Sequence, residues 1–374
     1  MIYLDNAATT PMDSEVLETM IEYMKTEYGN PSSKYYPQAL RAQEALKHAR
    51  EQVAELLDCD QEYLLFTSGS TESNNFIIKG VAEKFSKKGK HIITSKIEHK
   101  SVLNTCKHLE KSGYEVTYVG NDELGHVNIE EIEAAIKEET ILVSIMWGNN
   151  EIGTLNDIEK ISELCRKKEV LFHTDATQVV GKINVNLKKI PVDFLSMSAH
   201  KIYGPKGIGI AYIGPDDLGL RMKLPSLLDG GDQEYKMRAG THAMHNIVGF
   251  GKACEVAERD MDLYVLQILK LENKFKNELL KARPDITFNG DQDNKIPGLL
   301  SINIPGINNE LFCKQVSNEI AISTGSACSI SEGSYVLSNL NKPSSNNTIR
   351  FYLTFASEIN DIIKTLLQAL STLK

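Results

Sequence analysis

The sequence lacks the features that define several large protein classes. Its apolar runs, such as residues 141–147, fall far short of the roughly 20 residues that a membrane-spanning helix needs. Its six cysteines form no CxxC pair, which argues against a zinc cluster or a disulfide framework. Asp5 lies where a secretion signal needs its apolar stretch, so we expect no targeting peptide and a cytoplasmic protein.

The chain also lacks the positive charge that is typical of nucleic-acid binding. It has 41 Lys and Arg residues against 50 Asp and Glu residues, and its formal net charge of −9 opposes binding to phosphate backbones. We therefore expect no direct nucleic-acid partner. The sequence contains no internal repeat, and the absence of a GxGxxG motif weakens a dinucleotide-binding hypothesis.

What the sequence does contain is a regular alternation of short apolar runs and helical patterns between about residues 63 and 213. This alternation predicts an α/β fold. The expected strands cover residues 63–67, 91–95, 115–119, 141–146, 170–174, 194–198 and 208–213. Open α/β sheets bind ligands at the carboxyl ends of their strands. Polar residues follow those ends here: Thr71, His99, Asn150, Asp175 and Lys201.

The remainder of the chain predicts a second, smaller domain. A long helical pattern covers about residues 242–282, and a strand-like run follows at 299–304. A helix is expected near 309–318, another strand at 349–353, and a helix at the end of the chain. At 374 residues with 41% hydrophobic content, the chain is long enough for two or three domains.

Residues 66–73, FTSGSTES, are typical of an anion site. A strand runs into a small-residue loop, and Glu72 opens a helical pattern. Backbone N–H groups at a helix start, together with the hydroxyls of Ser70 and Thr71, favour phosphate. An ordinary N-capped turn is the alternative interpretation of this segment alone.

Two further segments place charged groups beside the expected edge of the sheet. Lys201 follows a strand in SMSAHKIYGPKG and could form a Schiff base, although an isolated lysine is more often a solvated surface charge. Asp175 ends a buried-looking strand in FHTDATQ, where a carboxylate is costly unless it meets a cation. A pyridinium nitrogen is such a cation.

Together these segments resemble the NifS/IscS-type cysteine desulfurases, a class V group of fold-type I pyridoxal-phosphate (PLP) enzymes. That group includes the desulfurases of DNA phosphorothioation systems. The resemblance is carried, in family order, by YLDNAATTP, YGNPSS, TSGSTESNN, EH, NNEIG, DATQ, SAHKIYGPKG, MRAGT, STGSAC and IRF. It spans nearly the whole chain.

The resemblance implies a mostly parallel seven-stranded sheet in a large PLP-binding domain at residues 15–255. A smaller α/β domain would comprise residues 1–14 and 256–374 and carry the catalytic cysteine loop. It implies that Lys201 forms the Schiff base with PLP, that Asp175 partners the ring nitrogen and that His99 stacks on the ring. The implied cofactor contacts are Lys201, Asp175, Gln178, His99, Ser70, Thr71, Asn150, Ser198, His200 and Thr241.

The resemblance also implies how substrate is bound and how the enzyme assembles. Arg350 would clamp the carboxylate of L-cysteine, assisted by Asn30 and Asn150, since a guanidinium fork suits a carboxylate. Thr241 matches a residue that reaches the phosphate of the neighbouring subunit's cofactor, which implies a homodimer with shared sites.

Cys328 is the implied persulfide carrier. A lone cysteine is more often a small buried hydrophobe, but GSAC followed by SISEGS is small and polar, as befits a loop that presents a thiol. The implied reaction converts L-cysteine to L-alanine: Lys201 moves the α-proton, Cys328 takes the sulfur, and His99 is a candidate acid/base. The sulfur would pass to an acceptor protein of iron–sulfur assembly, tRNA thiolation or DNA phosphorothioation.

Two segments depart from the family pattern. Asp232 stands where a third glycine is usual, and the segment after Cys328 is shorter than the common loop by about two residues, which limits its reach. These departures leave the acceptor open.

Several rival functions are weighed against the desulfurase. Another class V PLP enzyme, an aminotransferase or a selenocysteine lyase, is the nearest, and a transaminase needs no GSAC cysteine. A metal-dependent hydrolase would need His173, Asp175, His242 and His245 to converge, and no HExxH motif supports it. A sulfur-transfer scaffold without cofactor would not need to retain Lys201 and Asp175.

Overall fold

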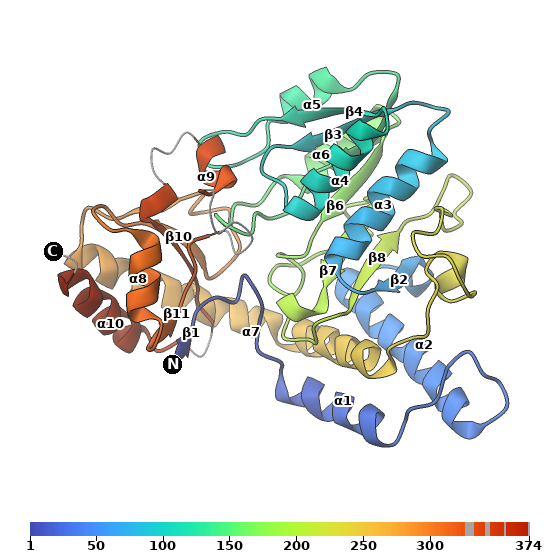
Figure 1. Cartoon of the computed structure of the whole chain (residues 1–374), viewed down its shortest axis with the longest axis horizontal. Coiled ribbons are helices and arrows are strands. Elements are labelled where there is room, and N and C mark those ends of the chain that lie inside the picture. Colours follow the sequence, from blue (N-terminus) through green and yellow to red (C-terminus); the bar gives the residue numbers. More distant parts are fainter. Residues whose placement is uncertain (326–332, 341–344, 355–356, 373–374) are drawn as a thin grey trace.

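A seven-stranded sheet forms the centre of the molecule (Figure 1). This computed structural model describes residues 1–325, 333–340, 345–354 and 357–372. The strand order is β2-β8-β7-β6-β5-β3-β4. The strands are β2 (Leu64–Thr67), β3 (His91–Ser95), β4 (Glu115–Val119), β5 (Thr140–Ser144), β6 (Leu171–Asp175), β7 (Phe194–Ser198) and β8 (Gly209–Ile213). The predicted sheet is confirmed, with each strand within a few residues of its expected range.

One strand runs against the others. β8 pairs antiparallel with both β2 and β7, whereas all other neighbouring pairs in this sheet are parallel. Six strands therefore point the same way, and their carboxyl ends meet at one edge of the sheet. All but one of the residues of β3, β5, β6 and β7 are buried, which is expected of a parallel sheet covered on both faces.

Helices cover the two faces of this sheet and connect its strands. They are α1 (Ser14–Lys25), α2 (Pro37–Leu57), α3 (Ser70–Lys84), α4 (Lys100–Lys111), α5 (Ile129–Ala135) and α6 (Ile158–Lys167). α7 (Met244–Ala282) packs on α1 and α2 and continues beyond the sheet towards the C-terminal part, as Figure 1 shows. No helix within the described ranges is both long and apolar enough to cross a bilayer.

The C-terminal part is built around a second, smaller sheet. β12 (Thr348–Tyr352), β10 (Leu299–Asn303) and β9 (Thr287–Asn289) form it in that order, with antiparallel pairing. β1 (Ile2–Tyr3) pairs parallel with β11 (Ile320–Ala321), so the chain start lies in this part. The helices here are α8 (Asn309–Val316), α9 (Tyr335–Asn339) and α10 (Ile359–Thr372).

Apolar side chains of this C-terminal part form a cluster of their own. It contains Leu4 from the chain start, Phe275 from α7, and Leu300, Phe351 and Leu366 from the C-terminal elements. The division into residues 15–255 and the rest would fall inside α7, and it stays a prediction.

Candidate active site

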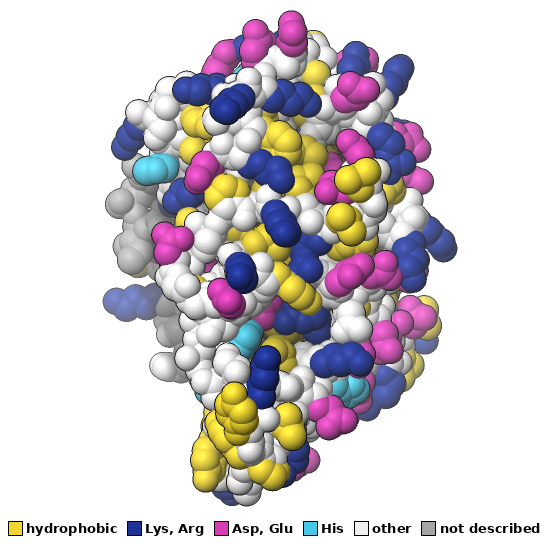
Figure 2. Space-filling view, turned by 90° about the vertical axis from the view of Figure 1, so that its right-hand side faces the viewer, with side chains coloured by type: hydrophobic (Ala, Val, Ile, Leu, Met, Phe, Trp, Pro, Cys, Tyr) yellow, Lys and Arg dark blue, Asp and Glu magenta, His cyan; other side chains and the backbone are white. Residues whose placement is uncertain are grey.

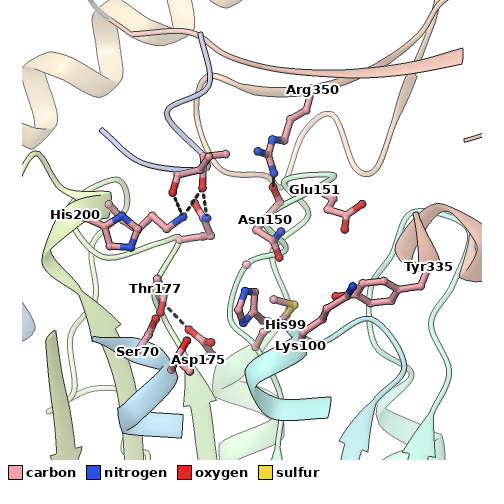
Figure 3. Close-up of a pocket in the computed structure, with 17 residues that line it drawn as sticks. Ser70, His99, Lys100, Asn150, Glu151, Asp175, Thr177, His200, Tyr335 and Arg350 are labelled. Atoms are coloured by element: carbon pink, nitrogen blue, oxygen red, sulfur yellow. Dashed lines mark hydrogen bonds between the residues drawn. The ribbon is translucent and has the colours of Figure 1, made fainter. Parts of the chain in front are cut away.

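A cavity of about 260 Å³ opens at the carboxyl edge of the large sheet and extends to the C-terminal part. In Figure 3 Asp175 and Ser70 lie at its base, His99 and Asn150 in the middle, and Arg350 at the opposite end. Its lining includes most of the residues expected from the sequence: Ser70, Thr71, His99, Asn150, Asp175, Gln178, His200, Lys201 and Arg350. Residues separated by up to 280 positions therefore converge on one space.

Asp175 places a buried carboxylate at the base of the cavity. It ends β6 and is 5% exposed. Its oxygens accept hydrogen bonds from Asn74 Nδ2 at 2.7 Å and from the Thr177 backbone N–H at 3.0 Å. Both partners are neutral, and within the described residues Asp175 has no ion pair. A cationic ring nitrogen bound in the cavity would supply the missing counter-charge.

The loop between β2 and α3 forms an anion cradle. Gly69 has φ of 144° and immediately precedes α3, whose first residues, Ser70 and Thr71, line the cavity. A Cβ on Gly69 would lie 3.3 Å from Ser198 Oγ, so glycine allows the loop to lie close against β7. The Glu72 carboxylate accepts from Arg238 Nε at 2.9 Å and from the Ser68 backbone N–H at 2.8 Å. Its charge is thereby paired, and the N–H groups at the start of α3 favour a phosphate.

His99 presents a neutral ring to the cavity. It caps α4: its Nδ1 accepts the Ser101 backbone N–H at 3.2 Å and lies 2.8 Å from Ser101 Oγ. Burial lowers the pKa of His99, and Lys201 adds to this effect, whereas Asp175 opposes it. Because Nδ1 accepts, the ring hydrogen of the neutral form is on Nε2.

Lys201 is held at the edge of the cavity by the start of the chain. Its Nζ donates to the carbonyls of Ala7 at 2.5 Å and Ala8 at 2.6 Å. Gln178 Nε2 donates to the same Ala7 carbonyl at 2.9 Å, and Gln178 Oε1 accepts from Lys182 Nζ at 3.2 Å. Burial lowers the pKa of Lys182 to about 7, and the Lys201 and Arg350 charges contribute. The Ala7 carbonyl therefore binds both Lys201 and Gln178.

His200 lies beside Lys201, and its environment disfavours a charged ring. Its Nδ1 lies 3.1 Å from Thr9 Oγ1. Burial lowers the pKa of His200 to about 4, with further lowering by Lys201 and Lys206. His200 is therefore a neutral hydrogen-bonding group at physiological pH.

Arg350 lies on β12 and is 2% exposed. Its guanidinium donates three hydrogen bonds to protein oxygens. Nη1 donates to the carbonyls of Asn150 and Gly325, each at 2.9 Å, and Nη2 donates to Asp5 Oδ1 at 2.8 Å. A guanidinium has five N–H donors, so two remain: the Nε–H, which has no partner among the described residues, and one Nη2–H. Two donors are what a bidentate bond to a carboxylate requires.

Some of the expected residues do not line the cavity of a single chain. Ser198 is buried behind Gly69. Asn30 is exposed, and its Oδ1 accepts the Ser32 N–H at 2.9 Å in the turn between α1 and α2. Thr241 is also exposed and outside the lining. Cys328 lies outside the described residues. The roles assigned to these residues stay predictions.

The structure adds residues to which the sequence assigned no role. Asn74 binds Asp175 from α3, four residues along the helix from Ser70. The carbonyls of Ala7 and Ala8 bind Lys201, although YLDNAATTP was noted only as a motif. Thr177, Lys100, Glu151 and Tyr335 also line the cavity. Of these residues, Asn74 could have been predicted from the sequence, because it follows Ser70 by one helical turn and so lies on the same face of α3.

The candidate ligands of a metal hydrolase do not converge. His173 lies between Ser144 Oγ at 2.8 Å and Ser196 Oγ at 3.1 Å, inside the sheet. His242 Nε2 instead contacts Glu234 Oε1 at 2.7 Å. In the part of the chain that the structure describes, no three His, Cys, Asp or Glu side chains are arranged to hold a metal.

Comparison with known proteins decides the family. The chain matches the family model described as Aminotransferase class-V over residues 2–364. This chain belongs to the class-V aminotransferase family. It is 44% identical to the cysteine desulfurase IscS of Shewanella sp. (strain MR-4), over 100% of this chain and 93% of that relative.

Solved structures of similar proteins agree with the fold. One described as a NifS-like protein matches with a TM-score of 0.92 and 36% identity, covering 99% of both chains. Another, described as SspA in complex with cysteine, matches with a TM-score of 0.81 and 34% identity, covering 94% of this chain and 99% of that one. The family and the fold-type I architecture predicted from the sequence are confirmed.

The residues present fit PLP, the cofactor of this family. The uncompensated Asp175 carboxylate suits the ring nitrogen, the Gly69 cradle suits the phosphate, and the Lys201 amine suits the aldehyde. Two buried polar atoms that line the same cavity, Asn150 Oδ1 and Thr177 Oγ1, have no partner in the described protein. Such atoms are costly unless a ligand satisfies them.

Proposed function

We propose that this chain is a PLP-dependent cysteine desulfurase that transfers the sulfur of L-cysteine to Cys328 and releases L-alanine. One observation carries the proposal: a single cavity joins an uncompensated carboxylate, a lysine amine and an arginine with two spare donors. The first two groups suit the cofactor. The third suits an amino-acid substrate.

Asp175, Lys201 and His99 serve the proton chemistry. When bound, PLP supplies an electron sink that makes the substrate α-proton acidic. Asp175 keeps the ring nitrogen protonated, and the bonds from Asn74 and Thr177 fix the orientation of its carboxylate. Lys201 takes the proton from the α-carbon, and the neutral His99 ring exchanges protons with the substrate thiol through Nε2.

Arg350 orients the substrate by its carboxylate. The Nε–H and the spare Nη2–H bind the two carboxylate oxygens, while the bonds to Asn150 and Gly325 hold the guanidinium in place. Asn30 assists this binding by family analogy, although one chain alone does not bring it to Arg350.

Cys328 performs the sulfur transfer. Its thiolate attacks the substrate sulfur, so a sulfur–sulfur bond forms while the bond between that sulfur and the substrate β-carbon breaks. The electron pair of the broken bond stays with the carbon fragment, which takes up a proton and leaves as alanine. The balance is L-cysteine plus Cys328 thiol giving L-alanine plus Cys328 persulfide. No outside oxidant or reductant is needed.

The persulfide sulfur then passes to an acceptor protein of iron–sulfur assembly, tRNA thiolation or DNA phosphorothioation. The segment that follows Cys328 in the sequence is short, which restricts acceptors to those that bring their own thiol close. Transfer of labelled sulfur from the charged enzyme to purified candidate acceptors would identify the class.

The functional unit is a homodimer in which Thr241 completes the partner's site. Thr241 is exposed and does not line the cavity of its own chain. Figure 2 shows hydrophobic side chains gathered at the lower tip of one face, where the turn between α1 and α2 lies. Exposed residues of this turn and of the start of α2 include Tyr28, Tyr35 and Leu40, which are 78%, 94% and 52% exposed. Such a surface favours association.

The Cys328→Ser variant tests the proposed reaction. It should stay yellow and still change its absorption on addition of L-cysteine, because Lys201, Asp175 and Arg350 are intact. Alanine should not form, since a hydroxyl is a far weaker nucleophile toward sulfur than a thiolate. Alanine and sulfide production at the wild-type rate would show that the chain is another kind of PLP lyase.

Mixing an inactive variant with an impaired one tests the shared site. Lys201→Ala disables a chain's own cavity, and Thr241→Ala weakens the phosphate contact that the chain gives to its partner. A mixed dimer contains one intact site, so activity should reappear on mixing under subunit exchange. A mixture no more active than its parents at the same cofactor concentration would contradict the role of Thr241.

A further inference from the structure

Glu151 is a buried carboxylate in the wall of the cavity that the proposed chemistry leaves unused. It directly follows Asn150 in the loop after β5 and is 3% exposed. In Figure 3 it lies on the side where Arg350 and Tyr335 enter the site. Its Oε2 accepts a hydrogen bond from Ser334 Oγ at 2.5 Å, and its backbone N–H donates to Asn149 Oδ1 at 2.8 Å. Burying a carboxylate costs free energy, which indicates that Glu151 has a functional role.

The partner of Glu151 lies at one flank of the segment that carries Cys328. Ser334 follows residues 326–332 and caps α9, where its Oγ accepts the Leu337 N–H at 3.0 Å. The next residue, Tyr335, donates from its hydroxyl to the Glu98 carbonyl at 2.6 Å. α9 also packs on Ile97 and Ile152, in loops of the large sheet. This flank is therefore fixed to the large sheet.

The other flank is fixed beside the same carboxylate. Gly325 precedes residues 326–332, and its carbonyl accepts Arg350 Nη1 at 2.9 Å. Gly325 has φ of 101°, and a Cβ built on it would lie 3.4 Å from Glu151 Oε2. The two flanks thus come together at Glu151 and Arg350, although eight residues separate Gly325 from Ser334 in the sequence.

We propose that Glu151 is a positioning residue for the sulfur-transfer step: with Arg350 it holds both flanks of residues 326–332 and so keeps Cys328 within reach of bound cysteine. The inference rests on the proposed function of Cys328. A segment tied at both ends next to the substrate has a high effective concentration of its thiol there. Releasing one end lowers that concentration without changing the substrate clamp.

The hydrogen bond, rather than the charge, is what the proposal requires. Burial raises the pKa of Glu151, whereas the Ser334 bond and Arg350 lower it. A glutamine has the same shape, and its Oε1 can accept from Ser334 Oγ as the carboxylate does. Glu151→Gln should therefore keep the anchor that Glu151→Ala loses.

The test separates substrate binding from sulfur transfer in the PLP-loaded enzyme. Glu151→Ala and Ser334→Ala should each slow alanine formation in a single turnover by about tenfold or more, because the tethered thiol is diluted. The dissociation constant for L-cysteine, titrated spectroscopically in the Cys328→Ser background, should not change. The Glu151→Ala/Ser334→Ala double variant should lose no more than Ser334→Ala alone, because Ser334→Ala already removes the bond to Glu151 together with the cap on the Leu337 N–H.

Two controls belong with these variants. Glu151→Gln should stay close to the wild-type rate. Ser338→Ala removes a hydroxyl that donates to the Ser334 carbonyl at 3.0 Å from the same short helix, but it keeps the Glu151 bond. It should also stay close to wild type, which separates loss of the anchor from general loosening of α9.

Wild-type single-turnover rates in both Glu151→Ala and Ser334→Ala would overturn the proposal. So would a Glu151→Gln variant as slow as Glu151→Ala alongside a normal Ser334→Ala variant, since Glu151 would then act on the substrate directly. If Glu151→Ala does not fold, Ser334→Ala carries the same test. Failure of the proposed function looks different: the Cys328→Ser enzyme would then show no spectral response to cysteine, or would still form alanine.

Discussion

Arg350→Ala tests whether Arg350 binds the substrate carboxylate. The expected loss of kcat/KM follows from the number of guanidinium donors that remain for that carboxylate. Three of the five donors are used by Asn150, Gly325 and Asp5, which leaves two for the carboxylate of cysteine. Hydrogen bonds to charged groups are worth about 1.5–3 kcal/mol each, so two contribute about 3–6 kcal/mol. At about 1.4 kcal/mol per factor of ten, kcat/KM for cysteine should fall by a factor between about 10² and 10⁴.

The assay compares L-cysteine with cysteamine, which has the thiol and amine of cysteine but no carboxylate. Loss of the Arg350 bond to Gly325 slows sulfur transfer from both compounds alike. Arg350→Ala should therefore reduce kcat/KM for cysteine by a further factor that cysteamine does not show, because the two donors to the carboxylate have no partner on that compound. Asp5→Asn is the matched control: it keeps an oxygen acceptor near Nη2 and leaves the two spare donors in place. Equal losses of kcat/KM for both compounds in Arg350→Ala would refute the clamp.

Three further predictions concern ionisable side chains. Lys201→Ala should abolish turnover and the absorption band of the lysine-bound cofactor, and full activity would contradict the Schiff-base assignment. Asp175→Asn should weaken PLP retention, measured by dialysis and absorbance, because the ring nitrogen loses its only charged partner in the described site. Glu98→Gln should flatten the dependence of stability on pH. Burial raises the pKa of Glu98 to about 8, so the folded state holds a proton that the unfolded state releases from about pH 4.5. Wild-type stability therefore falls as pH rises to about 8. Urea midpoints at pH 5 and pH 8.5 should therefore differ less in Glu98→Gln than in wild type.

The sequence predicted those parts of the site that local pattern determines. Asp175 is the last residue of β6, and His99 follows the end of β3 by four positions, so the ends of these two strands place both residues at the sheet edge. The family, the reaction class and the PLP cofactor, implied by ten motifs, are confirmed by the class-V family match and by the cysteine desulfurase relatives. The seven strands follow from the same apolar runs.

Other parts of the site depend on packing between distant elements, which one-dimensional patterns do not encode. The bond from Glu151 to Ser334 joins residues 183 positions apart, and neither side chain has a distinctive local setting. The carbonyls of Ala7 and Ala8 have no side-chain signal at all. Asn30 was expected at Arg350, but the fold of one chain leaves it in an exposed turn.

The first ten residues take part in the site to a degree that matters for gene annotation and for expression design. Ile2 and Tyr3 pair with β11, Asp5 binds Arg350, and Ala7 and Ala8 bind Lys201. A translation product initiated at Met12 would lack all of these contacts while retaining every side chain assigned to the chemistry. Such a product would fail to position both its lysine and its arginine, so a complete set of catalytic side chains would belong to an inactive protein.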